Sequence, residues 1–371
     1  MQLSVIILNY KVPYHLLLCL ESVQRSLKGM EAEIIVVDNN SQDESCEWVE
    51  KFFPQVKLIA NSGNDGFSKG NNIGIDEAQG KYICLLNPDT VIGENTFKNL
   101  LEFAENHPDF GSIGPKLIDG RGRFLPESKR NIPTPKIALK KLLFNGKSYY
   151  SELDENESGA VEILAGAFML MRKDRYFEVG KLDEDYFMYG EDIDLSYKFL
   201  KAGYQNYYVG SEPVLHFKGE SSAKDEVYRK RFYDAMMIFY QKHFQKNIFS
   251  RYLVQLGLNL AKMTHGWRQP AKPEEELIYG FLCIDYNPQL AVKLEKKFQV
   301  EVRIIKPEEV EQKNPEEEFI IFNAETLSYQ KILHLIQLLG KQDNKFRIKP
   351  MGFKFFLGSD HTLTQGEVLQ L

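Results

Sequence analysis

Residues 82–89 read Tyr82-Ile83-Cys84-Leu85-Leu86-Asn87-Pro88-Asp89, an apolar run that ends in a polar turn. The apolar part is typical of a buried strand. Pro88 fixes its own φ and biases Asn87 towards extended geometry, so the backbone determines where Asp89 points. A carboxylate at the carboxyl end of such a strand lies where open α/β sheets bind ligands, and its oxygens would suit Mg²⁺ or Mn²⁺. The simpler interpretation is an ordinary turn, because all three polar residues favour turns.

The first half of the chain alternates apolar runs with helical patterns. Ser41-Gln42-Asp43-Glu44 reads as a capping box, which predicts that a helix begins there and ends at Phe53. The alternation predicts an α/β fold with a parallel, doubly wound sheet, whose functional residues lie on the loops after the strands. The predicted strands are Leu3–Asn9, Glu33–Asp38, Val56–Ala60 and Lys81–Leu86, and the other predicted helices are Tyr14–Leu27 and Phe67–Ala78.

The order of elements changes after Asp89. A first domain is predicted at residues 1–244 and a small α/β, Rossmann-like domain of unknown role at 276–371. In the first domain we expect strands at Phe110–Ile118, Ile163–Met171 and Val209–Phe217, with helices at Thr96–Asn106, from about Ile193 to Ala202, and from about Lys224. In the second we expect strands at Leu277–Asp285, Val300–Ile305 and Phe319–Phe322, with helices at Gln289–Lys297 and Ser328–Leu339.

Residues 245–275 are predicted to form an amphipathic basic helix and a linker. Apolar side chains recur at helical spacing among basic residues, and the linker contains Pro270 and Pro273. One interpretation is an ordinary helix packed on the first domain. The other is an interfacial helix that lies on anionic lipid through its basic rim. The apolar positions are Ile248, Tyr252, Leu256, Leu260 and Met263.

Composition narrows the class of protein. A formal net charge of −6 over 371 residues argues against a nucleic-acid binder. The four cysteines are widely separated with no CxxC pair, which predicts free thiols. The chain starts directly with a strand-like run instead of a signal peptide, and no stretch reaches the ~18 apolar residues of a membrane span. We therefore expect a cytoplasmic protein, with peripheral contact to the inner face of the plasma membrane as a further option.

Polar residues also follow the first two predicted strands. Asp38-Asn39-Asn40 could be a turn before the next helix, or Asp38 could accept hydrogen bonds from a nucleobase imide or a ribose hydroxyl. Asn9-Tyr10 would line the same crevice, where a tyrosine ring can stack on a base. The stretch 61–72 is dense in glycine and asparagine, yet it contains neither a Walker A loop nor a G-x-G-x-x-G fingerprint.

Two further groups carry chemistry later in the chain. Glu191-Asp192-Ile193-Asp194 follows the aromatic run Tyr186-Phe187-Met188-Tyr189 and opens a predicted helix. The acids could simply favour the helix dipole, or aromatic neighbours could desolvate one carboxylate and raise its pKa, as a general base requires. His216 could be structural, or it could contact phosphate or metal from a loop that also holds Lys218 and Gly219.

Together these stretches resemble family 2 glycosyltransferases, because they occur in the order found in that family. Within the family, the chain is similar to the bacterial rhamnosyltransferase-like subset, including His216 and Ser221 in an H-x-x-G-x-S arrangement. The resemblance covers about residues 1 to 245 and implies a GT-A fold, an inverting mechanism and a nucleotide-diphosphate-sugar donor. The matching stretches are Val5–Tyr10, Val36–Ser41, Asn64–Asn72, Leu86–Asp89 and Tyr189–Asp192.

The resemblance also implies roles for individual residues. Asp192, supported by Glu191, would be the catalytic base, and Asp89 with His216 would hold Mg²⁺ or Mn²⁺. Asn87 replaces the first aspartate of the family's Asp-x-Asp motif, which leaves one metal-ligating carboxylate there. The nucleotide-sugar donor would contact Asn9, Tyr10, Asp38, Asn40, Asn64, Gly66, Phe67, Asn71, Asn72, Asn87 and Asp89.

The implied activity is transfer of rhamnose or another hexose to a lipid-linked or growing cell-surface polysaccharide. A sugar nucleotidyltransferase is one alternative, although residues 9–13 lack the glycine-rich, basic signature of that class. A non-catalytic scaffold that binds sugar nucleotides is another, although Asp38, Asp89 and Asp192 are all present.

Overall fold

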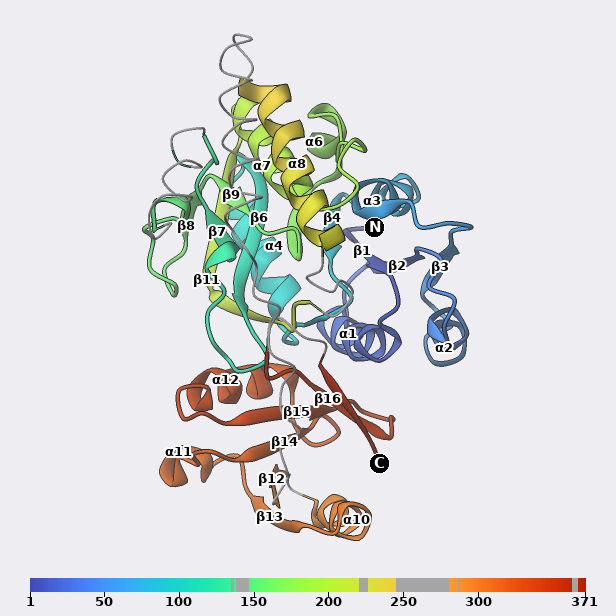
Figure 1. Ribbon diagram of the computed structural model, residues 1–371, viewed down its shortest axis with the longest axis vertical. Helices are drawn as coiled ribbons and strands as arrows, with labels where there is room; N and C mark the ends of the chain where they lie inside the picture. Colours follow the sequence, from blue (N-terminus) through green and yellow to red (C-terminus); the bar gives the residue numbers. More distant parts are fainter. Residues whose placement is uncertain (135–136, 138–146, 220–225, 245–279, 286, 362–365) are drawn as a thin grey trace.

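The structure is a computed structural model that describes residues 1–134, 137, 147–219, 226–244, 280–285, 287–361 and 366–371. Among these residues the strands form a nine-stranded sheet, a six-stranded sheet and a two-stranded ribbon. Figure 1 shows the six-stranded sheet, in orange and red, below the larger one. The predicted helix and linker at 245–275 lie outside the described residues, so the domain limits at 244 and 276 stay predictions.

The first half of the larger sheet confirms the predicted alternation. Four parallel strands lie in the order β3-β2-β1-β4, and β1 and β4 are apolar and almost fully buried because helices cover both faces. The strands are β1 (Leu3–Asn9), β2 (Ala32–Asp38), β3 (Lys57–Ala60) and β4 (Tyr82–Leu86). The helices between them are α1 (Pro13–Ser26), α2 (Ser45–Phe52) and α3 (Gly66–Asp76).

The sheet becomes mixed beyond β4. The order continues β10-β6-β11-β5, with β10 antiparallel to both β4 and β6, so the purely parallel arrangement stops at β4. The single strand predicted at Ile163–Met171 is two strands, because a turn at 165–167 interrupts it. The strands are β5 (Thr90–Val91), β6 (Phe110–Ile118), β7 (Lys129–Arg130), β8 (Gly159–Val161), β9 (Ile163–Leu164), β10 (Phe168–Arg172) and β11 (Gln205–His216).

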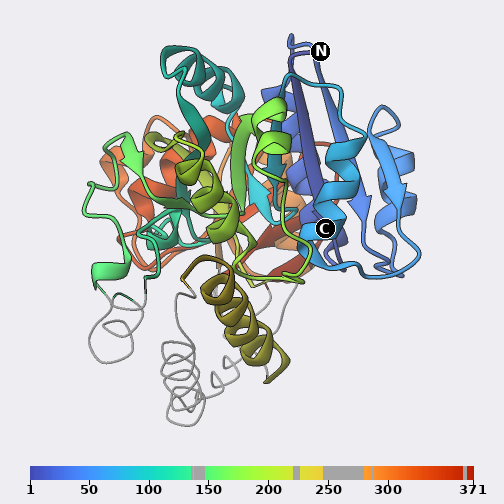
Figure 2. The ribbon, with the colours of Figure 1, turned by 90° about the horizontal axis from the view of Figure 1, so that it is seen from above.

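Helices of this second half cover the mixed part of the sheet. They are α4 (Thr96–Asn106), α6 (Lys173–Glu178), α7 (Glu191–Lys201) and α8 (Glu226–Phe244), with short 3₁₀ turns η1 (Pro126–Ser128) and η2 (Lys147–Tyr149). Gly203 has φ +90°, as expected of a left-handed residue after α7. α8 packs beside α7 through aromatic side chains, and Figure 2 shows it from above.

The predicted capping box before α2 is wrong. α2 begins at Ser45 without a side-chain cap. Ser41 instead donates its hydroxyl to Asp38 Oδ1 at 2.5 Å and its backbone N–H to Asp38 Oδ2 at 2.9 Å. A short polar side chain in a turn binds the nearest buried acceptor, and here that acceptor is the carboxylate at the end of β2.

The C-terminal sheet has the order β13-β12-β14-β15-β16-β17, and its first four strands are parallel. This confirms the α/β character predicted for this part of the chain. The strands are β12 (Gly280–Ile284), β13 (Glu301–Ile305), β14 (Phe319–Asn323), β15 (Lys345–Lys349), β16 (Phe355–Gly358) and β17 (Glu367–Gln370). The helices are α10 (Pro288–Phe298), α11 (Val310–Lys313) and α12 (Tyr329–Leu339).

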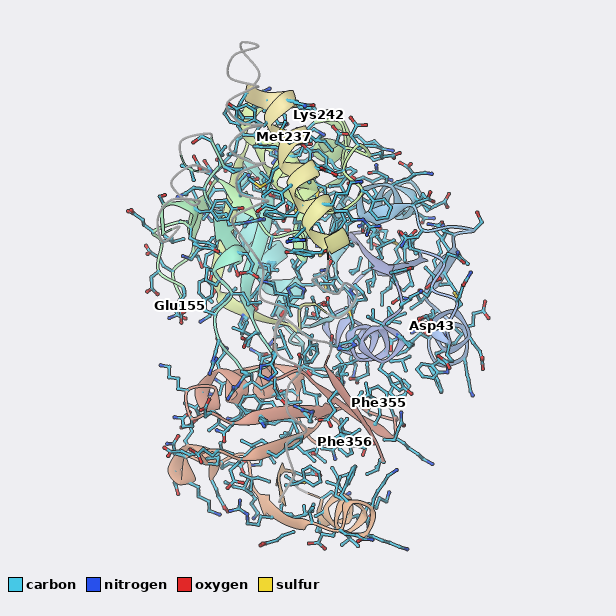
Figure 3. All side chains as sticks on the ribbon, in the orientation of Figure 1. Asp43, Glu155, Met237, Lys242, Phe355 and Phe356 are labelled. Carbon is cyan, nitrogen blue, oxygen red and sulfur yellow. The ribbon has the colours of Figure 1, made fainter. Side chains whose placement is uncertain are left out.

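The two sheets share one hydrophobic core. A single cluster of buried apolar side chains includes residues of α1 and β1 together with residues of α12, β14 and β16. Phe355 and Phe356, labelled in Figure 3, are neighbours on β16 and enter different clusters. Phe355 meets the ring of Tyr14 on α1 edge-on, with centroids 5.0 Å apart, whereas Phe356 packs within the C-terminal sheet. The C-terminal sheet is therefore packed directly on the first domain.

Candidate active site

The carboxyl ends of β1, β2 and β4 place three predicted residues at one edge of the larger sheet. Asn9 and Asp38 are register partners at the ends of β1 and β2, and the turn 87–89 follows β4 on the other side of β1. The backbone N–H of Asn87 donates to the Ala167 carbonyl at 2.9 Å, which ties the turn to the segment before β10. The side chains of Asn9, Asp38 and Asp89 are all buried.

Asp38 is held by residues from both neighbouring segments. Its Oδ1 accepts hydrogen bonds from Asn9 Nδ2 at 2.8 Å and from the Ser41 hydroxyl, and its Oδ2 accepts the Ser41 N–H. The Cys46 side chain also forms a hydrogen bond with this carboxylate, so its roughly four acceptor positions are largely used within the fold. Ser41 is thus a site residue that we had predicted only as a helix cap, and Asn9 orients Asp38.

Asn39 organises the asparagine- and glycine-rich loop. Its amide donates to Asn64 Oδ1 at 2.9 Å and to the Gly66 carbonyl at 3.1 Å, and its oxygen accepts from Asn61 and from the Asp65 N–H. Gly66 has φ +79°, and a Cβ there would lie 2.5 Å from the Phe187 carbonyl. The loop therefore rests on the segment that leads to Glu191. Sequence reasoning had named Asn40, which takes up a left-handed φ of 61°, instead of Asn39.

Asn71 and Asn72 point into the fold. Asn72 donates to the Leu182 carbonyl and to Glu184, and accepts the Tyr176 hydroxyl at 2.5 Å. Asn71 donates to the Phe67 carbonyl one turn earlier on α3. These bonds give both residues a structural role in fixing α3, and the donor contacts predicted for them stay predictions.

Asp89 and His216 lie together, as predicted for a metal-binding pair. His216 Nε2 is 3.4 Å from Asp89 Oδ1 and 3.5 Å from Asn87 Nδ2. Burial pushes the pKa of Asp89 upward, but the charge and hydrogen bond of His216 outweigh it and hold the pKa below its usual value. Burial lowers the pKa of the neighbouring His15 to about 4, so His15 is neutral at pH 7. Asp89 is consequently an ionised carboxylate at the edge of the sheet.

Asp89 and His216 could supply two of the about six ligands that a divalent ion such as Mg²⁺ takes. Two ligands at about 2.1 Å from one ion and at right angles lie about 3 Å apart, close to the 3.4 Å between Asp89 Oδ1 and His216 Nε2. Within the described parts of the chain, no three or more His, Cys, Asp or Glu residues form a group that could hold an ion. The remaining ligands would have to come from a bound substrate.

Glu127 lies between this pair and the second half of the site. It forms an ion pair with Lys218, and that charge outweighs burial and lowers the pKa of Glu127. The positive charge of His216 acts on Glu127 in the same direction. Burial and then the charge of Glu127 raise the pKa values of Tyr150 and Tyr228. Glu127, in η1 before β7, therefore interacts both with Lys218, which follows β11, and with Tyr228 on α8.

Asp192 is held by three segments at the start of α7. Its Oδ2 accepts Arg130 Nη2 at 2.6 Å and the Gly166 N–H at 3.0 Å, and its Oδ1 accepts the N–H of Ile193 at 2.8 Å. A Cβ at Gly166 would lie 3.2 Å from Asp192 Cβ, which explains why glycine stands there. Arg130 is a site residue that sequence reasoning missed, because nothing local marks it within the basic run 129–147.

Glu191 is the carboxylate whose protonation the fold alters. Burial, and then the negative charge of Asp192, raise the pKa of Glu191 to about 8, although Arg130 acts in the opposite direction. Glu191 is therefore mostly protonated at pH 7. Only 6% of it is exposed, and its Oε2 has no hydrogen-bond partner among the described residues. The sequence predicted that one acid of the pair would have a raised pKa, and the structure assigns this property to Glu191.

Asp194 has a structural role instead. It accepts His243 Nε2 at 2.6 Å and forms an ion pair with Lys198 at 2.8 Å. Burial pushes the pKa of Asp194 upward, but these two partners outweigh it and lower the pKa. Lys242, labelled in Figure 3, forms ion pairs with Asp183 and Asp185. These contacts fix the end of α8 against the loop that precedes Glu191.

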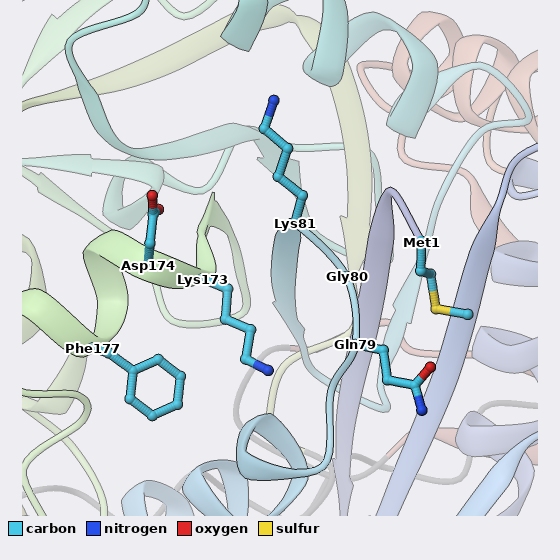
Figure 4. Close-up of a pocket in the computed structure, with 7 residues that line it drawn as sticks. All are labelled: Met1, Gln79, Gly80, Lys81, Lys173, Asp174 and Phe177. Atoms are coloured by element: carbon cyan, nitrogen blue, oxygen red, sulfur yellow. The ribbon is translucent and has the colours of Figure 1, made fainter.

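An open hollow of about 460 Å³ lies elsewhere, at the amino edge of β1 and β4. Figure 4 shows its lining, which includes Met1, Gly80, Lys81, Lys173 and Phe177. The amino ends of parallel strands are opposite the edge where α/β sheets bind ligands. The hollow is therefore separate from the candidate active site.

The larger, mixed sheet has the GT-A fold. Residues 4–178, just under half of the chain, match the glycosyl transferase family 2 profile. The chain is 28% identical over 241 residues to N-acetylglucosaminyl-diphospho-decaprenol L-rhamnosyltransferase of Mycobacterium tuberculosis, a match that covers 60% of this chain and 78% of the relative. It is also 28% identical over 253 residues to the low-salt glycan biosynthesis hexosyltransferase Agl10 of Haloferax volcanii, covering 64% and 76%.

A solved structure gives the same fold at lower sequence similarity. GalNAc-T7, crystallised with UDP, GalNAc and Mn²⁺, aligns with a TM-score of 0.50 and 18% identity. The alignment covers 70% of this chain and 54% of that protein. In the described part of the chain, no helix has the length and apolar character needed to cross a membrane. The family match supports the glycosyltransferase interpretation.

Proposed function

We propose that the chain is an inverting glycosyltransferase that moves L-rhamnose or another hexose from a nucleotide-diphosphate donor to a lipid-linked or growing cell-surface glycan. The observation that carries this proposal is the segment 164–167, which contacts both halves of the site. The Ala167 carbonyl holds the Asn87 turn and the Gly166 N–H holds Asp192. The name of the mycobacterial relative supports rhamnose and a lipid-linked acceptor, and the name of the Haloferax relative supports a hexose.

The donor would lie along the carboxyl edge of the parallel strands. Asp38, fixed by Asn9 and Ser41, would receive the nucleobase, and Tyr10 after β1 would line the same crevice. Asp89 and His216 would hold Mg²⁺ or Mn²⁺, which when bound neutralises charge on the donor diphosphate. Lys218, two residues beyond His216, is paired with Glu127 near this end of the site.

Asp192 would act as the base. Its Oδ1 carries only the neighbouring Ile193 N–H, so this oxygen has room to accept the proton of an acceptor hydroxyl. The hydroxyl oxygen forms a bond to the anomeric carbon while the carbon–oxygen bond to the diphosphate breaks. The electron pair of that bond leaves on the diphosphate, and attack from the opposite face inverts the configuration. Glu191, protonated at pH 7, adds no second negative charge beside Asp192.

A lipid-linked acceptor would lie at a membrane surface. The protein would therefore contact the membrane peripherally during the reaction. Residues 245–275, with their basic and apolar side chains, are the segment that we propose for this contact. Flotation with vesicles of phosphatidylcholine alone and with added phosphatidylglycerol tests the proposal. Binding that requires the anionic lipid and weakens with salt supports it, and absence of binding to both vesicles refutes it.

Asp192→Asn tests the proposed chemistry. We expect this variant to lose transfer by at least about 100-fold, while calorimetry still detects nucleotide-sugar binding. Thermal shift with a panel of nucleotide sugars first selects the donor, because a ligand that binds the native state raises the melting temperature. Proton NMR of the product then reports the anomeric configuration. Retained turnover in Asp192→Asn would remove Asp192 as the base, and a retained configuration would exclude the inverting mechanism.

A further inference from the structure

We infer that Arg130 is a positioning residue that holds the Asp192 carboxylate turned towards the acceptor hydroxyl. The inference rests on the proposed role of Asp192 as the base. Arg130 does not touch the reacting atoms in this scheme, since its guanidinium binds Asp192 Oδ2 and leaves Oδ1 for the proton.

The backbone fixes where Arg130 lies. β7 contains only Lys129 and Arg130, and it pairs antiparallel with β9, with Arg130 opposite Ile163. From this position Arg130 Nη2 donates both to the Leu164 carbonyl and to Asp192 Oδ2, each at 2.6 Å. The guanidinium is thus anchored to the strand on which the Gly166 turn begins. Tyr149 bonds to the same guanidinium, whose N–H groups lie in one fixed plane, unlike those of a lysine ammonium.

The contact is shielded from solvent, which makes the charge effective. The side chains of Arg130 and Asp192 are 11% and 14% exposed. Charge interactions are much stronger at such partly buried positions than at the surface. The Gly166 N–H supports the same oxygen, so rotation of the carboxylate would break two hydrogen bonds at once. Asp192 Oδ1 is therefore held in one direction.

Several ionisable groups surround the carboxylate. Arg130 faces it from β7, Glu191 and Asp194 lie on α7, and Tyr149 of η2 contacts Arg130. Glu191 is mostly protonated at pH 7, so Arg130 compensates the charge of one ionised carboxylate there. Loss of Arg130 would leave Asp192 Oδ2 with the Gly166 N–H alone, so the carboxylate could turn away from the acceptor hydroxyl.

Two substitutions test this positioning role. Arg130→Met removes the contact, and we expect kcat to fall about 100-fold. The donor KM should change by less than about twofold, because Arg130 makes no donor contact in this arrangement. Arg130→Lys keeps a charged donor that can approach Asp192 Oδ2, so kcat should fall less.

Arg123→Met is the matched control, because Arg123 is 58% exposed and binds Asp343 at the surface. Donor and acceptor are a nucleoside-diphosphate-L-rhamnose and an N-acetylglucosaminyl-diphospho-polyprenol, or the donor that the thermal-shift panel selects. If Arg130→Met does not fold, Arg130→Lys carries the test, and an unchanged kcat in it overturns the inference. An unchanged kcat in a folded Arg130→Met also overturns it. Activity in Asp192→Asn removes Asp192 as the base and this inference with it, whereas the absence of transfer by the wild-type protein would remove the proposed function itself.

Discussion

Glu191→Gln should make the enzyme more stable at neutral pH, because the native structure disfavours the ionised form of Glu191. Burial and the charge of Asp192 raise the pKa of this group from its ordinary value of 4.5 to about 8. Glutamine has the shape of the protonated side chain and cannot ionise. It therefore keeps the native contacts and removes a penalty that wild type carries.

The sign follows from proton binding in the two states. Between pH 4.5 and 8 the unfolded chain has released the Glu191 proton while the native state retains it, so raising the pH favours unfolding. When the unfolded chain binds one proton fewer than the native state, the free energy of unfolding falls by about 1.4 kcal/mol per pH unit. Allowing for partial ionisation near each pKa, the free energy of unfolding of wild type should fall by about 2 kcal/mol between pH 5 and pH 7. The effect vanishes below pH 4.5, where both states are protonated.

Thermal unfolding of wild type and Glu191→Gln at half-unit steps from pH 5 to 8 measures this effect. The difference in Tm should grow with pH and reach about 3 °C at pH 7 for a chain of this size. Comparing the two proteins cancels the titration of groups that both share. Glu102→Gln, an exposed position on α4, is the control and should show no pH-dependent difference. A Tm difference that is constant across this range would refute the assignment of the raised pKa to Glu191.

Two further predictions concern the metal and the contact between the sheets. If Asp89 and His216 hold an ion with the donor diphosphate, EDTA should weaken donor binding about tenfold, as measured by calorimetry. In Asp89→Asn, EDTA should no longer change the donor affinity. Equal affinity of wild type with and without EDTA would exclude a metal role. Arg25→Met should destabilise the chain by about 3 kcal/mol, because it removes the Arg25 guanidinium that lies 2.5 Å from the buried Glu21 carboxylate. The control Arg303→Met, at an exposed ion pair, should have little effect. An equal Tm for both variants would contradict the proposed importance of the Arg25–Glu21 contact.

The sequence predicted those parts of the site that depend on local patterns. Asp38 and Asp89 could be found because each stands directly after an apolar strand, and parallel strands bring such residues to one edge. Pro88 strengthened the prediction for Asp89 by restricting the turn. His216 could be placed near the edge because it ends a long extended run. Its pairing with Asp89 became a prediction only through the resemblance to the family.

The residues that support the site could not be predicted in this way. Arg130 and Asp192 are 62 positions apart, and their contact depends on the pairing of two short strands. Asn39 and Ser41 stand in a stretch that reads equally well as a turn, so their long-range partners were invisible. The choice between Glu191 and Asp192 depends on how deeply each side chain is buried. The sequence pattern alone identifies Glu191 and Asp192 as a pair of acids, but it does not show how deeply each side chain is buried.

The C-terminal sheet illustrates how packing decides what a fold can do. In the order β13-β12-β14-β15, the chain adds strands on opposite sides of β12, so the order reverses between β12 and β14. α/β sheets usually bind ligands at the carboxyl ends of the strands beside such a reversal. In this chain Arg25 of α1 donates to the carbonyls of Ala324 and Leu327 directly after β14. Residues of the first domain therefore occupy part of that edge.

The N-terminus of α12 leads to the same conclusion. A free helix N-terminus favours anions such as phosphate. Here the carboxylate of Glu94 accepts the backbone N–H groups of Tyr329 and Gln330 at 2.7 and 2.8 Å, and the Tyr329 hydroxyl donates to the buried Glu21. The first domain thus supplies the anion that a ligand would otherwise bring. Glu94 follows Asp89 by five residues, so docking of α12 also restrains the turn that carries Asp89. The C-terminal sheet therefore acts here as support for the active-site edge, and its own ligand edge is used for docking.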